Sequence, residues 1–305
     1  MAGARSFVPC RGSPTLDATI KGKITAMRTF LLSILLPLGL VVAAQNVLDG
    51  AYIKEHAPTR RAMAYSNLRE ADVMIAKRVW RTIDLRQRMN HLLFYPLEPA
   101  QGRCSLFDVI KRALLVEGTL TAYDPGVLLQ DDSFSRELTV DELRSLLEPI
   151  DTMWTPSLDD PDLLQPVVVP MSVSTVDITR YQIKEEWYFD KQRGMMDTRI
   201  IGLAPLREVR GENGELRGHA PLFWLYYPEL RHLLANAEAF DRGNDGARHT
   251  YEQVFEERLF SSYIIKESNV HDRRIGDHLQ GLDALLEADR TEQLLFEAEH
   301  DLWNH

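Results

Sequence analysis

Two histidine–aspartate dipeptides are the residues of this sequence that come nearest to catalytic machinery. His271-Asp272 and His300-Asp301 each place an imidazole beside a carboxylate, which is half of a hydrolytic triad. A triad also needs an activated nucleophile, but the sequence has no G-x-S-x-G elbow and Cys104 has no obvious partner. We therefore expect neither dipeptide to be catalytic and Cys104 to be a small buried residue.

Neighbouring carboxylates could instead act as an acid and a base. Glu185, Glu186 and Asp190 lie in a segment where apolar and polar residues alternate, as they do in a half-buried strand. Side chains of adjacent strand residues point to opposite faces of a sheet. We therefore expect Glu185 and Glu186 to be separated and unsuited to joint acid–base catalysis.

Phosphate and metal chemistry find no better support in the sequence. Gly211, Gly214 and Gly218 lie between two expected strands, and no Lys-Ser/Thr follows them, so they predict a hairpin turn and not a phosphate loop. The nine histidines show no H-E-x-x-H or C-x-x-C companion. The residues predict no enzyme, no cofactor and no metal site.

The overall charge limits the class of partner. The chain has 305 residues and a formal net charge of −10, with 45% hydrophobic and 26% charged residues. This composition is that of a folded globular protein. Acidic charge of this size argues against nucleic acid or anionic lipid as the main partner.

An apolar run near the N-terminus predicts export. Residues 30–44 carry no charge and follow Arg28, but they are too few for a membrane-spanning helix. Small residues end the run, which predicts signal-peptide cleavage between Ala44 and Gln45. The residue directly after that point is Gln45 and not the cysteine that lipidation requires, so we expect the mature protein to be free of a lipid anchor.

The chain divides into segments of different texture. Residues 1–26 resemble no targeting element, so Met27 is a plausible start. Residues 149–166 are rich in proline and acids and predict a linker or long surface loop. The expected division is an upstream extension (1–26), a signal peptide (27–44), an N-terminal α/β part (45–148), the acidic linker or loop (149–166), and a strand-rich then helical part (167–305).

Local patterns predict the elements that position these residues. We expect a helix over 67–77 and a strand over 79–85, and helices capped by Ser105 and by the capping box of Thr139 and Glu142. After the acidic segment we expect mainly strands as far as Tyr227, and then a helix that begins at Pro228. Further helices are expected over 251–260, 279–288 and 291–303. The predicted fold is α+β, with central antiparallel strands, flanking helices and a helical C-terminal part.

Short blocks dense in aromatic and basic residues are candidates for protein–protein contact. Trp, Tyr and Arg anchor interfaces where they reach the surface, although most such aromatics belong to a core. The candidate partner-binding residues are Trp80, Arg81, Trp187, Tyr188, Trp224 and Tyr227.

The same blocks resemble the GldN/PorN family, a gliding-motility and type IX secretion component of Gram-negative bacteria. The likeness covers nearly all of the chain after the signal peptide. The segments that carry it are 69–74 (READVM), 77–86 (KRVWRTIDLR), 183–192 (IKEEWYFDKQ), 196–202 (MDTRIIG), 221–229 (PLFWLYYPE), 262–270 (SYIIKESNV), 281–287 (GLDALLE) and 299–303 (EHDLW).

The resemblance implies a periplasmic structural subunit without catalytic residues, peripheral to the inner face of the outer membrane. It implies a ring in which copies assemble with one another and with a GldK/PorK-like outer-membrane lipoprotein. It also implies contact with the periplasmic domain of a GldM/PorM-like motor protein. The alternatives are a periplasmic chaperone or cargo-binding protein for exported substrates and, last, a hydrolase that gathers His271 or His300 with a carboxylate and a nucleophile.

Overall fold

The structure is a computed structural model that describes residues 60–100, 102–156, 164–211, 213–240 and 248–303. The expected upstream extension, the signal peptide and the cleavage point at Ala44 and Gln45 lie outside the described residues. Residues 58–305 belong to one unit of the chain. No described helix is long and apolar enough to cross a membrane.

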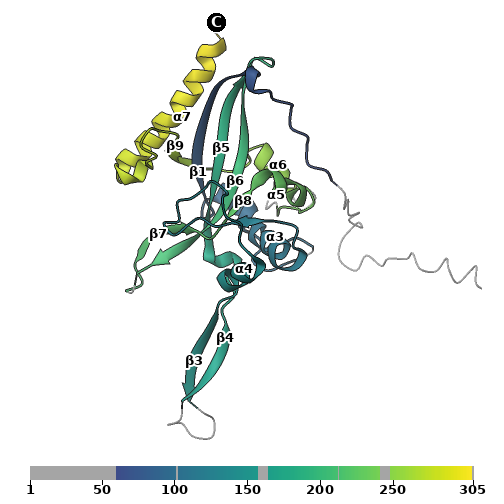
Figure 1. The fold of residues 1–305 in the computed structure, drawn as a ribbon, viewed down its shortest axis with the longest axis vertical. Coiled ribbons are helices and arrows are strands. Elements are labelled where there is room, and N and C mark those ends of the chain that lie inside the picture. Colours follow the sequence, from purple (N-terminus) through teal and green to yellow (C-terminus); the bar gives the residue numbers. More distant parts are fainter. Residues whose placement is uncertain (1–59, 101, 157–163, 212, 241–247, 304–305) are drawn as a thin grey trace, which may run out of the picture. The chain divides into compact units, whose positions relative to one another are not determined.

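Seven of the described strands form one antiparallel sheet, as the α+β prediction requires (Figure 1). The order is β2-β8-β6-β5-β1-β9, and β7 pairs with β6 beyond the end of β8. The strands are β1 (Val73–Asp84), β2 (Ala122–Tyr123), β5 (Ile178–Asp190), β6 (Met195–Arg210), β7 (Leu216–Pro221), β8 (Trp224–Tyr226) and β9 (Tyr263–Glu267).

Helices come before, between and after the strands. The α-helices are α2 (His91–Phe94), α3 (Leu106–Arg112), α4 (Val140–Leu147), α5 (Tyr227–Leu234), α6 (Tyr251–Glu256) and α7 (Leu282–Trp303). Short helical turns are η1 (Glu70–Asp72), η2 (Arg88–Asn90), η3 (Ala113–Glu117), η4 (Thr175–Asp177) and η5 (Ile275–Asp277).

The two faces of the sheet have different cores because successive residues of a strand point to opposite sides. Ile83 of β1 and Ile183 of β5 pack with residues of α3, α4, α5 and α6. Val79 lies four residues before Ile83 on β1 and therefore on the same face, where it packs against Ile264 of β9 and Leu295 of α7. Trp80 points the other way and packs with Trp224. The helices therefore cover one face, and a smaller aromatic cluster lies on the other.

Local signals for helix ends are confirmed. The Ser105 hydroxyl accepts a hydrogen bond from the amide of Asp108 and caps α3, and Gly118 ends the following turn with a φ of 61°. Thr139 and Glu142 form the predicted capping box of α4. Each of these signals depends only on residues three or four positions away.

The helix expected over 67–77 is wrong. Only η1 is helical there, and β1 begins at Val73. The register pairs Val73 with Asp190 and continues along β5 to Asp84 with Arg180. Backbone hydrogen bonds to a long partner strand outweigh the weak helical preference of this segment.

The segment expected to be a linker or long surface loop, residues 149–166, contains one whole strand of a hairpin and the first residues of the other. β3 (Ile150–Pro156) pairs with β4 (Leu164–Pro170) in a separate two-stranded sheet. The parts on either side of it do not form separate domains, because β1 from the N-terminal part lies between β5 and β9 of the C-terminal part. The two helices expected over 279–288 and 291–303 are one helix, α7.

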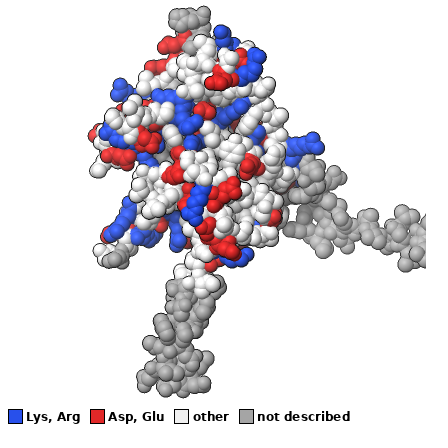
Figure 2. All heavy atoms as spheres, viewed as in Figure 1, with Lys and Arg blue, Asp and Glu red and all other residues white. Residues whose placement is uncertain are grey.

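Acidic and basic side chains are interspersed on the described surface, and many of them form ion pairs. On the face shown in Figure 2, lysines and arginines lie beside aspartates and glutamates. Examples are Arg86 with Glu208, and Arg136 with both Asp124 and Glu142. Interspersed charges of this kind give neutral local fields and do not form a phosphate track.

Candidate functional site

Five of the six residues expected to bind a partner are buried in the structure, and four of these five are aromatic. Trp80 and Trp224 pack in the aromatic cluster, and Tyr227 belongs to the core under the helices. Tyr188 is buried on β5, where its ring lies 5.4 Å from the Arg199 guanidinium. These four side chains serve packing, so burial removes them as surface anchors in this conformation.

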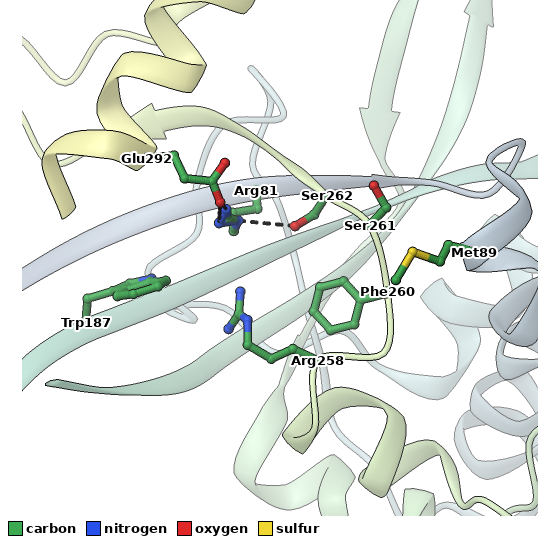
Figure 3. Close-up of a pocket in the computed structure, with 8 residues that line it drawn as sticks. All are labelled: Arg81, Met89, Trp187, Arg258, Phe260, Ser261, Ser262 and Glu292. Carbon is green, nitrogen blue, oxygen red and sulfur yellow. Dashed lines mark hydrogen bonds and ion pairs between the residues drawn. The ribbon is translucent and has the colours of Figure 1, made fainter. Parts of the chain in front are cut away.

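The other two, Arg81 and Trp187, line an open pocket of about 310 Å³ (Figure 3). We call it the Arg81–Trp187 pocket. The side chains that complete its lining come from η2, from the connection between α6 and β9, and from α7. They are Met89, Arg258, Phe260, Ser261, Ser262 and Glu292.

Strand alternation places the first residues of this pocket. Register pairs Lys77 of β1 with Trp187 of β5 and Arg81 with Ile183, so Arg81 and Trp187 share the helix-covered face. Glu185 lies between them on the same face and is fully buried, whereas Glu186 faces away and pairs with Arg78. The expected separation of the two glutamates is confirmed.

Arg81 is held by the C-terminal helix. Its side chain is 4% exposed and forms an ion pair with Glu292, which is 54% exposed. The Arg81 Nε also donates a hydrogen bond to Ser262 Oγ over 3.2 Å. Figure 3 shows Glu292 reaching from α7 to the guanidinium. Because one partner of this pair is open to solvent, a ligand's oxygen atoms can replace the glutamate without desolvating a buried carboxylate.

Arg258 fixes the opposite wall. Its Nη2 donates to both carboxylate oxygens of Glu185, at 2.9 and 3.2 Å. The guanidinium lies 5.6 Å from the ring centroids of both Trp187 and Phe260, within the range of cation–π attraction. Trp187 Nε1 donates to Glu185 as well. One buried carboxylate therefore orients the arginine and the indole together.

The charges that line the pocket are paired, and its other side chains are mostly apolar or aromatic. Its two arginines are balanced by Glu185 and Glu292, so it carries no excess charge for an anion. Arginine, tryptophan, phenylalanine and methionine at a solvent-accessible hollow are the residues enriched at protein–protein interfaces.

Sequence reasoning missed the residues around Trp80 on the other face. Lys266 Nζ lies 4.4 Å and Lys184 Nζ 5.8 Å from the Trp80 ring. Lys184 donates to the carboxylate of Asp132 at 2.9 Å, and Trp80 Nε1 donates to the same carboxylate. The signal was present in part, because lysines in the alternating strand pattern at Lys184 and Lys266 share a face with Trp80 once the register is known.

Of the two residues in the first histidine–aspartate dipeptide, Asp272 forms an ion pair with Lys266. His271 lines a cavity of about 180 Å³ with Thr291 and Glu267. However, the Thr291 hydroxyl donates to the carbonyl of Glu287, and Glu267 forms an ion pair with Lys77. Among the described residues, no group of three or more His, Cys, Asp or Glu side chains could hold a metal ion. Cys104 is half-buried against the main core.

A family model described as "Gliding motility associated protein GldN" matches residues 68–304. The match confirms the resemblance drawn from the sequence blocks, and it spans the strands and helices from β1 to the end of α7. No curated protein matches the chain.

Proposed function

We propose, from the premise that the chain belongs to the GldN family of gliding motility associated proteins, that it is a non-enzymatic structural subunit of the gliding and type IX secretion machinery. The family match over residues 68–304 carries this proposal. The open pocket beside Arg81 supports a role in protein contact, because its lining has the composition of an interface.

The proposed place is the periplasm, at the inner face of the outer membrane. The apolar run of residues 30–44 supports export, and glutamine in place of cysteine at position 45 supports a mature chain without a lipid anchor. Such a chain stays at the outer membrane by binding a lipidated partner, which we propose to be a GldK/PorK-like lipoprotein. Copies associate in a ring that also contacts the periplasmic domain of a GldM/PorM-like motor protein.

Helix α7, which supplies Glu292 to the pocket, also carries exposed apolar side chains. Ala288, Thr291 and Leu295 face the sheet and are buried. The opposite side of the helix carries Leu282, Leu285, Leu286 and Phe296, and Phe296 is 72% exposed. Apolar side chains grouped on one helix face mark interaction surfaces in soluble proteins. The Arg81–Trp187 pocket and these exposed apolar residues of α7 both support a subunit whose surface is in contact with partner proteins.

The test is gentle purification of a tagged chain from cell envelopes, followed by mass spectrometry and measurement of particle size. Recovery in a particle of many copies with an outer-membrane lipoprotein is the expected result. Recovery of a monomer without partners in several mild detergents would overturn the proposal. Reversible capture of many exported proteins by a monomer would favour the chaperone alternative.

A matched pair of variants tests the pocket. Met89 lines it and is 57% exposed, so Met89→Glu places a charge in the hollow without disturbing the core. Val116, on η3 and outside the pocket lining, is 79% exposed and gives the control Val116→Glu. We expect Met89→Glu to weaken partner recovery by about tenfold, which corresponds to about 1.4 kcal/mol. Equal recovery of both variants would exclude the pocket as a contact site.

A further inference from the structure

Residues 60–66 lie on the surface of the protein without forming a helix or a strand (Figure 1). We call this segment the arm. Its central residue, Met63, is held by its backbone: Arg231 Nη2 donates to the Met63 carbonyl at 2.6 Å, and the Met63 amide donates to Glu252 Oε1 at 3.1 Å. Arg231 and Glu252 are both buried and pair at 2.8 Å. A buried ion pair thus binds an extended backbone, while the Met63 side chain is 71% exposed.

Tyr65 provides the side-chain anchor of the arm. Its ring is in contact with two guanidinium groups, with its centroid 3.7 Å from the Cζ of Arg231 and 4.9 Å from the Cζ of Arg199. The Tyr65 hydroxyl donates to Glu256 Oε1 at 3.2 Å. Burial raises the pKa of Tyr65, with the Glu256 carboxylate adding to the rise, so the phenol remains a donor at any physiological pH. Arg199 also donates to the Ser66 carbonyl at 2.5 Å.

The other end of the arm is bound in the same manner. The Arg60 amide donates to Asn236 Oδ1 at 3.1 Å, and Arg60 Nη1 donates to the Arg248 carbonyl at 3.1 Å. Side chains and carbonyls of the folded body therefore bind the arm at its start, middle and end. We call the body residues Arg199, Arg231, Glu252 and Glu256 the arm groove.

The arm has the properties of a tethered ligand. Residues 67–69, which connect it to η1, also form no helix or strand. The groove recognises mainly backbone and one tyrosine, and every copy of the chain carries both the groove and the arm. Exchange of an identical element between copies preserves all of these contacts and is a low-cost route to association. An emptied groove would leave the buried Arg231 and Glu252 without their backbone partners, which favours refilling.

We propose that the arm groove binds residues 60–66 of a second copy when copies lie side by side. Neighbours in an assembly face one another at millimolar effective concentration, at which an intermolecular arm competes with the chain's own. The inference rests on the proposed function in one respect, because assembly into a ring is what would bring neighbouring copies to that effective concentration. The exchange itself is a property of the chain and is tested without the lipoprotein.

Isotope-mixed crosslinking decides between the two modes. Ala62 is half-buried on the arm and is replaced by a photo-reactive residue in the full chain. Unlabelled and ¹⁵N-labelled chains are mixed at about 0.5 mM, irradiated and digested. Exchange predicts crosslinks to α5 and α6 in which one peptide is labelled and the other is not. Crosslinks that join only peptides of the same isotope, at that concentration and tenfold above it, would overturn the inference.

A complementary pair of variants provides the second readout. Tyr65→Ala weakens the arm and leaves the groove intact, while Arg199→Gln weakens the groove at a half-buried position and leaves the arm intact. In a mixture, exchange predicts about fivefold more crosslinks from the Arg199→Gln arm to the Tyr65→Ala groove than in the reverse direction. Equal numbers would count against exchange. Failure of the proposed function would appear separately, as loss of the large particle from envelopes.

Discussion

The ion pair of Glu185 and Arg258 allows a stability prediction that can be worked from the structure. Glu185 is 0% exposed, and Arg258 binds both of its oxygens from a position about a third exposed. Arg258→Ala leaves the carboxylate in the core with only the Trp187 indole as donor. Removing one partner of a buried ion pair lowers the free energy of unfolding by roughly 3–5 kcal/mol. Water has partial access to Arg258, so we expect a loss at the lower end, roughly 3 kcal/mol.

The assay is urea unfolding of the purified chain followed by tryptophan fluorescence and circular dichroism. Thermal unfolding gives a second measurement, because a loss of roughly 3 kcal/mol lowers the melting temperature by roughly 6–12 °C in a domain of this size. Arg258 has a φ of 54°, but alanine meets the same left-handed strain as arginine, so the backbone does not enter the difference. The change measured is therefore that of the pair.

A second variant separates charge from packing. Glu185→Gln added to Arg258→Ala removes the unpaired charge, and the glutamine can still accept from Trp187. We expect the double variant to recover to within about 1 kcal/mol of the parent, since a neutral hydrogen bond contributes about that much. The reasoning is refuted if Arg258→Ala alone loses less than about 1 kcal/mol, or if the double variant is no more stable than Arg258→Ala.

Three further changes test the packing, the caps and the pH response. Gly202→Ala brings a Cβ within 2.7 Å of the Phe134 ring and should destabilise by about 1–3 kcal/mol in urea unfolding, whereas a neutral result would mean that the ring moves freely. Ser105→Ala removes the cap of α3 and the 2.6 Å bond to the Thr175 hydroxyl, and should lose about 1–2 kcal/mol in the same assay. Burial lowers the pKa of His219 below its ordinary 6.5, so the unfolded chain binds more protons below that pH and stability falls on acidification. His219→Gln should flatten that slope between pH 6.5 and the lowered pKa, and an unchanged slope would assign it to other groups.

Helix caps could be read from the sequence because their physics is local. The Ser105 hydroxyl and the Thr139–Glu142 box bind backbone amides within one turn, so their partners are fixed by spacing. The merged helix α7 shows the limit of that approach. Nothing in Asp289-Arg290 stops a helix, because neither residue breaks the backbone pattern, and two expected helices are therefore continuous.

The sequence predictions were wrong at positions whose structure depends on contacts with residues far away in the chain. The N-terminal half of β1 has weak strand character by itself, and its pairing with β5 becomes evident only from the register. Trp224 and Arg81 were chosen by the same rule, yet one is enclosed by Phe134 and the other lines the open pocket. Residue type alone does not distinguish these cases, because exposure depends on which loop or helix covers a strand position.

The position of β1 also constrains the order in which the fold can form. β1 is the first strand of the described chain, yet it lies inside the sheet, with β5 on one side and β9 on the other. About 180 residues separate it from β9, so one edge of β1 has no partner until nearly the whole chain has been made. An open strand edge in an incomplete chain invites pairing with other chains. Completion of this sheet is therefore a late and strongly non-local event, which is better suited to a chain that folds only after it has been released in full.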